Sequence, residues 1–336
     1  MQKLFKKDKI LLAGAYGMVG RAIKRALIRK NYGNEKYSGQ LFCPSRKHLN
    51  FLNYIDLENW FDKYNPDIVI IAAAKVGGIL ANNNYPADFL LENLIIQNNL
   101  ISIAWKKKVR RLLFLGSSCI YPKFSKQPIV EDYLLSGSLE KTNESYALAK
   151  IAGIKLCEAL RNQYSFDAIS CMPSNLYGPF DNYNYQNSHV LPALIRKFSE
   201  AKEAGEPKIT CWGDGSPYRE FLHVDDLADA CLFLLENWDP DKSKNKNDSD
   251  NVINWINVGT GTEISIKNLT ELISNQIGYE GEVFWDKSKP NGTPKKTLCV
   301  QKINSLGWKH KIDLENGISE TIKSFNEEKT KGILRI

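Results

Sequence analysis

The sequence lacks any hydrophobic run of the roughly 18 residues that a membrane-spanning helix needs, so we expect no membrane association. It has no Cys-x-x-Cys pair, and its seven cysteines are widely spaced and odd in number. Neither a disulfide framework nor a metal site is therefore indicated, and we expect a reducing, cytoplasmic compartment. The basic N-terminus leads into a strand-like run with no small-residue cleavage site, so we expect no signal peptide.

The chain also lacks a block of charge of one sign. Its net charge is +7, but the basic residues are scattered, apart from one cluster at residues 106–111. Because no nucleic-acid-binding module is recognisable, we expect no nucleic-acid partner. A modest positive balance suits a small polyanion such as a dinucleotide or a sugar diphosphate. The length of 336 residues and the hydrophobic share of 43% indicate a globular protein of one large or two small domains.

Short apolar runs alternate with helical patterns in the first half of the chain. Residues 67–74, DIVIIAAA, form a continuous apolar run, as expected for a strand buried on both faces. Similar strand candidates are 10–13, 40–43, 111–115, 168–172 and 252–258, and helix candidates are 18–29, 86–107 and 146–163. This alternation predicts an α/β fold with a doubly wound parallel sheet. Residues 178–188 are predicted to be a site-lining loop, and residues 239–251 an exposed loop.

Three glycines, Gly14, Gly17 and Gly20, follow the first strand and open the first helix. A dinucleotide site needs one glycine for the tight turn, one for the approach of pyrophosphate and one for helix packing. The spacing GxxGxxG is associated with short-chain dehydrogenases. After the second strand, residues 43–47 contain no acid but include Arg46 and Lys47, which favours the 2′-phosphate of NADP(H), unless both are simply solvated cations. The loop contacts would also include Tyr16, Met18 and Val19.

Tyr146 and Lys150 lie four residues apart, on one face of a predicted helix. A tyrosine can deliver a proton during carbonyl reduction, and a nearby ammonium should lower its pKa toward neutrality. A serine-rich segment, residues 116–122, ends the preceding strand, where a hydroxyl can bind the substrate oxygen beside the tyrosine. The glycine loop after the first strand, the serine-rich strand end and the YxxxK pair together indicate a short-chain dehydrogenase.

Seven segments together resemble the GDP-L-fucose synthase family, in the family's order and over nearly the whole chain. They are AAAKVGG (72–78), NNNYPADF (82–89), LGSSCIYP (115–122), YALAKIAGIKLCE (146–158), PSNLYGPFDN (173–182), NSHVLPALIRKF (187–198) and REFLHVDD (219–226). The resemblance implies an extended short-chain dehydrogenase, with a Rossmann domain, a smaller C-terminal substrate domain and a homodimeric assembly. Residues 1–178 and about 220–260 would bind NADP(H), and residues 179–219 and 261–336 the GDP-sugar.

The same resemblance implies an activity: epimerisation of GDP-4-keto-6-deoxy-D-mannose at C3 and C5, followed by NADPH-dependent reduction at C4 to GDP-L-fucose. Tyr146 would be the proton donor of the reduction and Lys150 its partner. Ser117 would bind the substrate oxygen, and Cys119 with His189 would form the acid–base pair of epimerisation. From the residues alone, Cys119 could equally be a packed strand-end residue, and His189 a helix cap.

The resemblance also implies a set of binding residues. Cofactor contacts would include Ala73, Leu115, Gly116, Lys150, Pro173, Asn175, Leu176 and His189, and GDP-sugar contacts Lys197, Trp212, Arg219 and Asn291. Three positions depart from the family pattern: Lys197 stands where arginine is frequent, Asn291 where aspartate is common, and Tyr16 where some relatives have a basic residue. His223, Asp225 and Asp226 are expected to begin a helix and not to catalyse.

Three other functions stay open. One is a C4 reductase of another GDP-4-keto-sugar such as a heptose, although the presence of both Cys119 and His189 argues against reduction alone. A second is a redox-neutral epimerase or a 4,6-dehydratase, but Ser118 and Cys119 stand where dehydratases usually place an acid. The third, a non-catalytic dinucleotide sensor, would not need the tyrosine and lysine that this chain retains.

Overall fold

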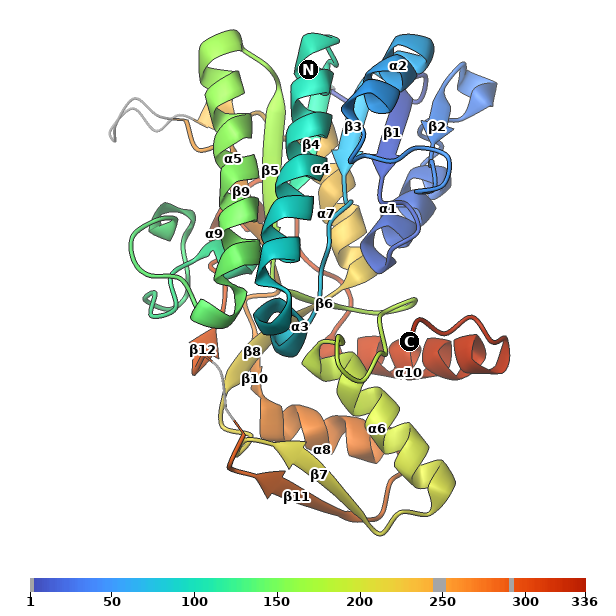
Figure 1. Cartoon of the computed structure of the whole chain (residues 1–336), viewed down its shortest axis with the longest axis vertical. Helices are drawn as coiled ribbons and strands as arrows, with labels where there is room; N and C mark the ends of the chain where they lie inside the picture. Colours follow the sequence, from blue (N-terminus) through green and yellow to red (C-terminus); the bar gives the residue numbers. More distant parts are fainter. Residues whose placement is uncertain (1–2, 244–251, 290–292) are drawn as a thin grey trace.

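The structure is a computed structural model, which describes residues 3–243, 252–289 and 293–336. Figure 1 shows a parallel sheet between two layers of helices and, below it, a smaller group of helices and strands. Within the described ranges, no helix combines the length and the apolar character that crossing a membrane requires.

The main sheet has six parallel strands in the order β2-β1-β3-β4-β5-β9. They are β1 (Lys9–Ala13), β2 (Gln40–Phe42), β3 (Ile68–Ile71), β4 (Arg111–Leu115), β5 (Ala168–Pro173) and β9 (Trp255–Val258). The direction of strand addition reverses between β1 and β3, and ligands of such sheets bind at this point, outside the carboxyl ends of the strands. The predicted doubly wound sheet is thus confirmed, although the last strand begins at Trp255 and not at residue 252.

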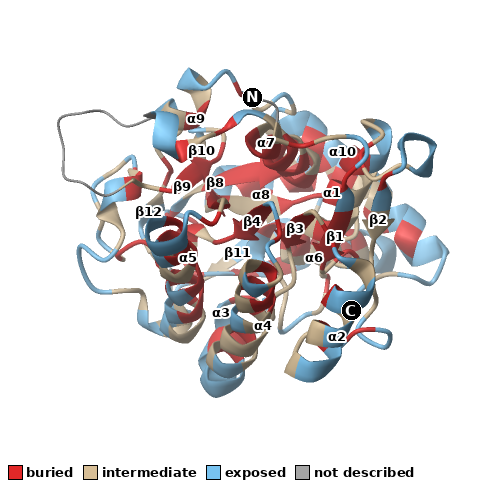
Figure 2. Cartoon of the chain, turned by 90° about the horizontal axis from the view of Figure 1, so that it is seen from above, coloured by how far each residue is buried: buried red, intermediate tan, exposed pale blue. Residues whose placement is uncertain are grey.

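Helices cover both faces of the sheet because side chains alternate along each strand. Ile10 and Leu12 of β1 pack with α1 (Met18–Arg29) and α7 (Val224–Asn237). Leu11 and Ala13 face the opposite layer, which consists of α2 (Tyr54–Tyr64), α4 (Pro86–Lys106) and α5 (Glu144–Tyr164). Figure 2 shows this distribution, with the strands and inner helix faces buried and the outer faces exposed.

The smaller group of elements is organised around β8 (Tyr218–His223), which pairs with three short strands. Its partners are β6 (Asn175–Tyr177), β10 (Glu263–Ser265) and β12 (Lys295–Lys296). Beside them, β7 (Lys208–Trp212) pairs with β11 (Glu282–Asp286), and the helices are α6 (Val190–Ala204), α8 (Ile266–Ile277) and α10 (Leu314–Thr330). Two short helices lie with the main sheet: α3 (Ile79–Asn84) packs against α4, and α9 (Gln301–Ser305) against β9. A separate core joins α6, α8 and α10, but Ile303 and Trp308 pack in the core of the main sheet. Residues 261–336 therefore contribute to both parts.

His223, Asp225 and Asp226 begin helix α7, as expected. His223 is the N-cap of α7, and its Nδ1 accepts a hydrogen bond from the Asp225 backbone N–H at 3.3 Å. The Asp226 carboxylate accepts hydrogen bonds from the backbone N–H groups of Lys311 and Ile312. Of the predicted exposed loop at 239–251, residues 240–243 form a 3₁₀ turn, and residues 244–251 lie outside the described part of the chain.

Candidate active site

The glycine loop connects β1 to α1 at the reversal point of the sheet. Gly14 has φ +89°, and a Cβ there would lie 2.6 Å from the Ala73 backbone nitrogen. A Cβ at Gly20 would lie 2.0 Å from the Gly14 carbonyl oxygen, so the first and third glycines allow the turn and the helix to pack closely. At Gly17, by contrast, a Cβ would meet no other atom nearer than 3.7 Å. The middle glycine therefore leaves open space at the start of the helix.

The N-terminus of α1 fits a phosphate group. Its N-cap residue, Gly17, makes no side-chain cap, and the first turn contains no acidic residue. The first N–H groups of a helix have no partner within the helix, and the positive end of its dipole attracts anions. Backbone donors and open space at one point are what a dinucleotide pyrophosphate requires, so the residues present fit NADP(H).

The other cofactor candidates lie around the same edge of the sheet. Ala73 follows β3, Leu115 ends β4 and Gly116 follows it, Pro173 ends β5, and Asn175 and Leu176 belong to β6. At the outer edge, Arg46 follows β2 and is exposed, as is Tyr16 in the glycine loop. Arg46 is therefore accessible to a phosphate, while the Asn175 amide already donates a hydrogen bond to the Glu220 carbonyl oxygen at 2.7 Å.

Tyr146, Ser117 and Lys150 come together where β4 meets α5. The Ser117 hydroxyl hydrogen-bonds with the Tyr146 phenol. Lys150 is buried, its Nζ donates a hydrogen bond to the Leu115 carbonyl oxygen at 2.8 Å, and it lies 5.9 Å from the centre of the Tyr146 ring. These contacts therefore fit a proton-donating tyrosine beside a substrate-binding hydroxyl.

The pKa values of this pair differ from the expectation. Burial raises the pKa of Tyr146 and a charge on Cys119 adds to the rise, while the hydrogen bond with Ser117 opposes it. Burial also lowers the pKa of Lys150 to about 8. The expected lowering of the Tyr146 pKa by Lys150 is thus wrong in direction, because desolvation outweighs it and the ammonium is directed at a backbone carbonyl. Tyr146 is accordingly held in its protonated, donating form.

Cys119 is half-buried in a polar environment and is not a packed apolar residue. It lies in a single 3₁₀ turn after β4, where its backbone N–H donates to the Ser117 hydroxyl oxygen at 3.2 Å. Its Sγ lies 3.7 Å from the Asn143 amide nitrogen and 3.4 Å from Lys296 Nζ. Sequence reasoning missed both neighbours: Asn143 stands only three positions before Tyr146, but Lys296 lies in a two-residue strand with no local signal.

His189 is the N-cap residue of α6, and its side chain makes no capping hydrogen bond. The residue is accessible to solvent. Even so, desolvation by the surrounding protein lowers the pKa of its imidazole, and the charge of Lys296 lowers it further. The neutral imidazole is therefore favoured. Lys296 thus contacts Cys119, and its charge also acts on His189.

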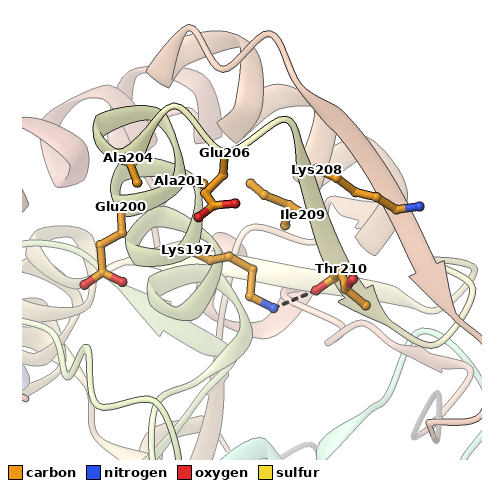
Figure 3. Close-up of a pocket in the computed structure, with 8 residues that line it drawn as sticks. All are labelled: Lys197, Glu200, Ala201, Ala204, Glu206, Lys208, Ile209 and Thr210. Atoms are coloured by element: carbon orange, nitrogen blue, oxygen red, sulfur yellow. Dashed lines mark hydrogen bonds between the residues drawn. The ribbon is translucent and has the colours of Figure 1, made fainter.

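The GDP-sugar candidates lie in the smaller group of elements. Lys197 of α6 donates a hydrogen bond from Nζ to the Thr210 carbonyl oxygen at 2.7 Å, beside an open cavity of about 370 Å³ between α6 and β7 (Figure 3). Trp212 ends β7 and is 58% exposed. Arg219, in β8 and in register with Lys296, is partly buried, and burial lowers its pKa while a charge on Cys119 raises it. Asn291 lies outside the described residues.

The model of the NAD dependent epimerase/dehydratase family matches residues 10–249. The chain belongs to this family. It is 51% identical to GDP-L-fucose synthase 1 of Arabidopsis thaliana, over 94% of this chain and 92% of the relative, and 47% identical to the GDP-L-fucose synthase of Escherichia coli K12, over 97% and 99%. MlghC, a GDP-mannoheptose C4 reductase from Campylobacter jejuni solved with NADP bound, superposes with a TM-score of 0.84 at 34% identity, covering 96% and 99%. The resemblance found in the sequence is confirmed.

In this member of the epimerase/dehydratase family, the loop of residues 178–188 is attached to the C-terminal helix. The Phe180 backbone N–H donates to Glu328 of α10 at 2.9 Å, and the Tyr183 ring packs on Phe325 with centroids 4.7 Å apart. Asp181 is 3% exposed, and among the described residues its Oδ2 and Glu328 Oε2 have no hydrogen-bond partner. Burial raises the pKa of Asp181 to about 7; the Asn182 backbone N–H and the charge of Arg335 oppose this rise.

This buried carboxyl should make the stability of the protein depend on pH. Between about pH 4 and pH 7, the folded chain keeps a proton on Asp181 that the unfolded chain releases, so the free energy of unfolding should decrease as the pH rises, by at most about 1.4 kcal/mol per pH unit. Asp181→Asn should flatten this dependence and should be more stable than the wild type above pH 7. Thermal unfolding of both proteins at pH 5 and pH 8 measures the difference. The exposed Asp132→Asn is the control. Parallel curves for Asp181→Asn and wild type would contradict the prediction.

Proposed function

We propose that this chain epimerises GDP-4-keto-6-deoxy-D-mannose at C3 and C5 and reduces the product at C4 with NADPH, forming GDP-L-fucose. The observation that carries the proposal is the proximity of two sets of groups. Lys296 Nζ lies 3.4 Å from Cys119 Sγ and its charge acts on His189, while Cys119 acts electrostatically on Tyr146, which hydrogen-bonds with Ser117. A pair suited to proton exchange thus adjoins a pair suited to carbonyl reduction.

NADP(H) is the cofactor, and it supplies the hydride that reduces C4. The backbone N–H groups after Gly17 hold its pyrophosphate, and Arg46 holds the 2′-phosphate. Lys150 lies between Tyr146 and the end of β4, within reach of a ribose placed at the carboxyl edge of the sheet. Gly14, Gly20 and Ala73 keep the backbone of this edge closely packed.

For the reduction, Tyr146 gives its proton to the oxygen that develops negative charge at C4. Its raised pKa keeps it protonated near neutrality, and the Ser117 hydroxyl supplies a second hydrogen bond to the same oxygen. Lys150, charged below about pH 8, stabilises the phenolate that remains. The three side chains thereby hold and move one proton at one oxygen.

For the epimerisation, the ketone at C4 acidifies the hydrogens at C3 and C5, because their removal gives an enolate. Tyr146 and Ser117 stabilise its oxygen, which is usually the largest catalytic contribution. Inversion requires a base on one face of the sugar and an acid on the other, and we assign these roles to Cys119 and His189. Thiol and imidazole side chains are, as classes, suited to proton exchange near neutral pH.

The nucleotide-sugar is held by the smaller group of elements, residues 179–219 and 261–336. Lys197 and Arg219 provide positive charge for the diphosphate, and the exposed Trp212 ring provides an apolar face. Asn291, which stands where the family commonly has aspartate and lies outside the described residues, is the remaining candidate.

One assay tests the proposed function. The purified protein is incubated with GDP-4-keto-6-deoxy-D-mannose in heavy water, first without and then with NADPH. We expect deuterium at C3 and C5 in the first step, and one NADPH consumed per GDP-L-fucose in the second. Deuterium incorporation without NADPH consumption would indicate a redox-neutral epimerase. If the protein neither incorporates deuterium nor consumes NADPH, the proposed function is overturned.

The structural similarity to the heptose reductase MlghC favours one alternative, a C4 reductase of another GDP-4-keto-sugar. The GDP-L-fucose synthases of Arabidopsis thaliana and Escherichia coli named above are closer in sequence, at 51% and 47% identity against 34%. The same assay separates the two functions, since a pure reductase consumes NADPH without placing deuterium at C3 or C5.

The choice of NADPH over NADH should depend on Arg46. Arg46→Ala should raise KM for NADPH about 10- to 100-fold, because a hydrogen bond to a charged group contributes about 1.5–3 kcal/mol. KM for NADH, which has no 2′-phosphate, should not change. Arg29→Ala, exposed on α1, is the matched control. If KM rises equally for NADPH and NADH, Arg46 does not bind the 2′-phosphate.

We also propose a homodimer in the cytoplasm. The neighbouring helices α4 and α5 expose Leu91 and Leu148, which are 60% and 44% accessible. Exposed apolar side chains on adjacent helices suit a two-fold helical interface. All seven cysteines are free, which is compatible with a reducing compartment. Light scattering should give twice the chain mass of 38.2 kDa, and a monomer would contradict the proposal.

A further inference from the structure

The main-chain position of His189 depends on a loop, residues 178–188, that contains no helix and no strand. Asn184 organises the end of this loop, since its side-chain oxygen accepts hydrogen bonds from the backbone N–H groups of Gln186 and Asn187. These contacts shape the turn, but they do not attach it to helix α5, which carries Tyr146, or to the 3₁₀ turn that carries Cys119. The contacts of the loop with α10 lie at Phe180 and Tyr183, so an attachment closer to His189 has to come from another element.

Gly78 provides this attachment. It lies between β3 and α3, and its backbone N–H donates a hydrogen bond to the Asn187 carbonyl oxygen at 2.9 Å. A Cβ on Gly78 would lie 2.5 Å from the carbonyl oxygen of Ser188, the residue directly before His189. The backbone of Gly78 has φ −67°, which any residue can adopt, so glycine is required here for space and not for conformation.

Asn82 holds the position of Gly78. Its side chain is 6% exposed, and its amide nitrogen donates to the carbonyl oxygens of Gly77 and Gly78 at 2.8 and 3.0 Å. The amide therefore ties α3 to the residues that precede it. A buried side chain with two short hydrogen bonds to the backbone leaves Gly78 little freedom to yield.

We propose that Gly78, held by Asn82, is a positioning residue that places His189 for proton exchange at the sugar. This inference rests on the function proposed above. A methyl group at residue 78 must move the Ser188 carbonyl from 2.5 Å to at least 3.0 Å, and the adjacent His189 moves with it. A misplacement of about 1 Å in an active site can reduce a rate by about 100-fold.

The test compares Gly78→Ala, Asn82→Ala and wild type. The readouts are deuterium incorporation at C3 and C5 without NADPH, and the dissociation constant for NADPH. We expect Gly78→Ala to lose exchange by about 100-fold, with a far smaller change in NADPH affinity. Asn82→Ala adds no atom and should show a smaller loss of deuterium exchange. It provides the test if Gly78→Ala does not fold. Gly137→Ala is the control, because its Cβ would lie 3.3 Å from the Pro122 side chain and would require a shift of only a few tenths of an ångström in that side chain, and not in the Ser188 carbonyl.

A double-mutant cycle separates positioning from general damage. In the His189→Gln background, Gly78→Ala should cause no further loss of the residual exchange, since the group it positions is gone. If the losses add, or if both single variants exchange like wild type, the positioning role is overturned while the proposed function stands. If wild type itself exchanges no deuterium and consumes no NADPH, both proposals fall together.

Discussion

Tyr146→Phe is expected to abolish C4 reduction while leaving NADPH binding intact. The substitution removes only the hydroxyl that would protonate the C4 oxygen, and the ring contact with Phe89, at 6.4 Å between centroids, can persist. General acid catalysis contributes about 10²- to 10⁴-fold, so the rate of NADPH oxidation with the keto-sugar should fall by at least that range. The dissociation constant for NADPH, measured by fluorescence titration, should stay within about twofold.

A tyrosine on the same helix supplies the matched control. Tyr164 ends α5, is 50% exposed, and hydrogen-bonds only with its neighbour Gln163 among the contacts described for its hydroxyl. Tyr164→Phe should therefore reduce the keto-sugar at the wild-type rate. If Tyr146→Phe reduces the keto-sugar at the wild-type rate, Tyr146 is not the proton donor. If the same variant loses NADPH affinity, the role of Tyr146 is structural.

The main sheet was predictable from sequence because its signals are local. A strand buried on both faces needs a continuous apolar run, which residues 67–74 supply, and the turn after β1 needs glycines at fixed spacing. Helix α2 was missed because its sequence, YIDLENWFDKY, fully buries only Leu57 and Phe61, which is too few for a clear periodic pattern. Local composition thus predicts the elements that are buried most completely.

The electrostatics of the site were not predictable in the same way. The spacing of Tyr146 and Lys150 predicts that they are neighbours, but not that both are desolvated, and burial decides the direction of the Tyr146 pKa. The contact between Cys119 and Lys296 joins residues 177 positions apart. It exists only because β12 pairs with β8 beside the end of β4, and no local pattern encodes such a pairing.

Replacing either acid–base residue should change the product and not only the rate. Cys119→Ser retains the shape of the side chain but substitutes a hydroxyl, which ionises far less readily than a thiol. His189→Gln retains hydrogen-bonding atoms but cannot exchange a proton near neutrality. In both variants, deuterium incorporation at C3 and C5 should fall by about 10²- to 10⁴-fold.

Reduction should persist in these variants because Tyr146, Ser117 and Lys150 are unchanged. The NADPH consumed would then reduce a sugar whose C3 and C5 have not been inverted, so the product should be a GDP-6-deoxyhexose with the configuration of the substrate at both carbons. Nuclear magnetic resonance of the product distinguishes this sugar from GDP-L-fucose. Cys299→Ser, at another half-buried thiol, is the control and should form GDP-L-fucose at the wild-type rate. If Cys119→Ser and His189→Gln also form GDP-L-fucose at that rate, the groups around Lys296 are not the acid and the base, and the exchange must take place elsewhere.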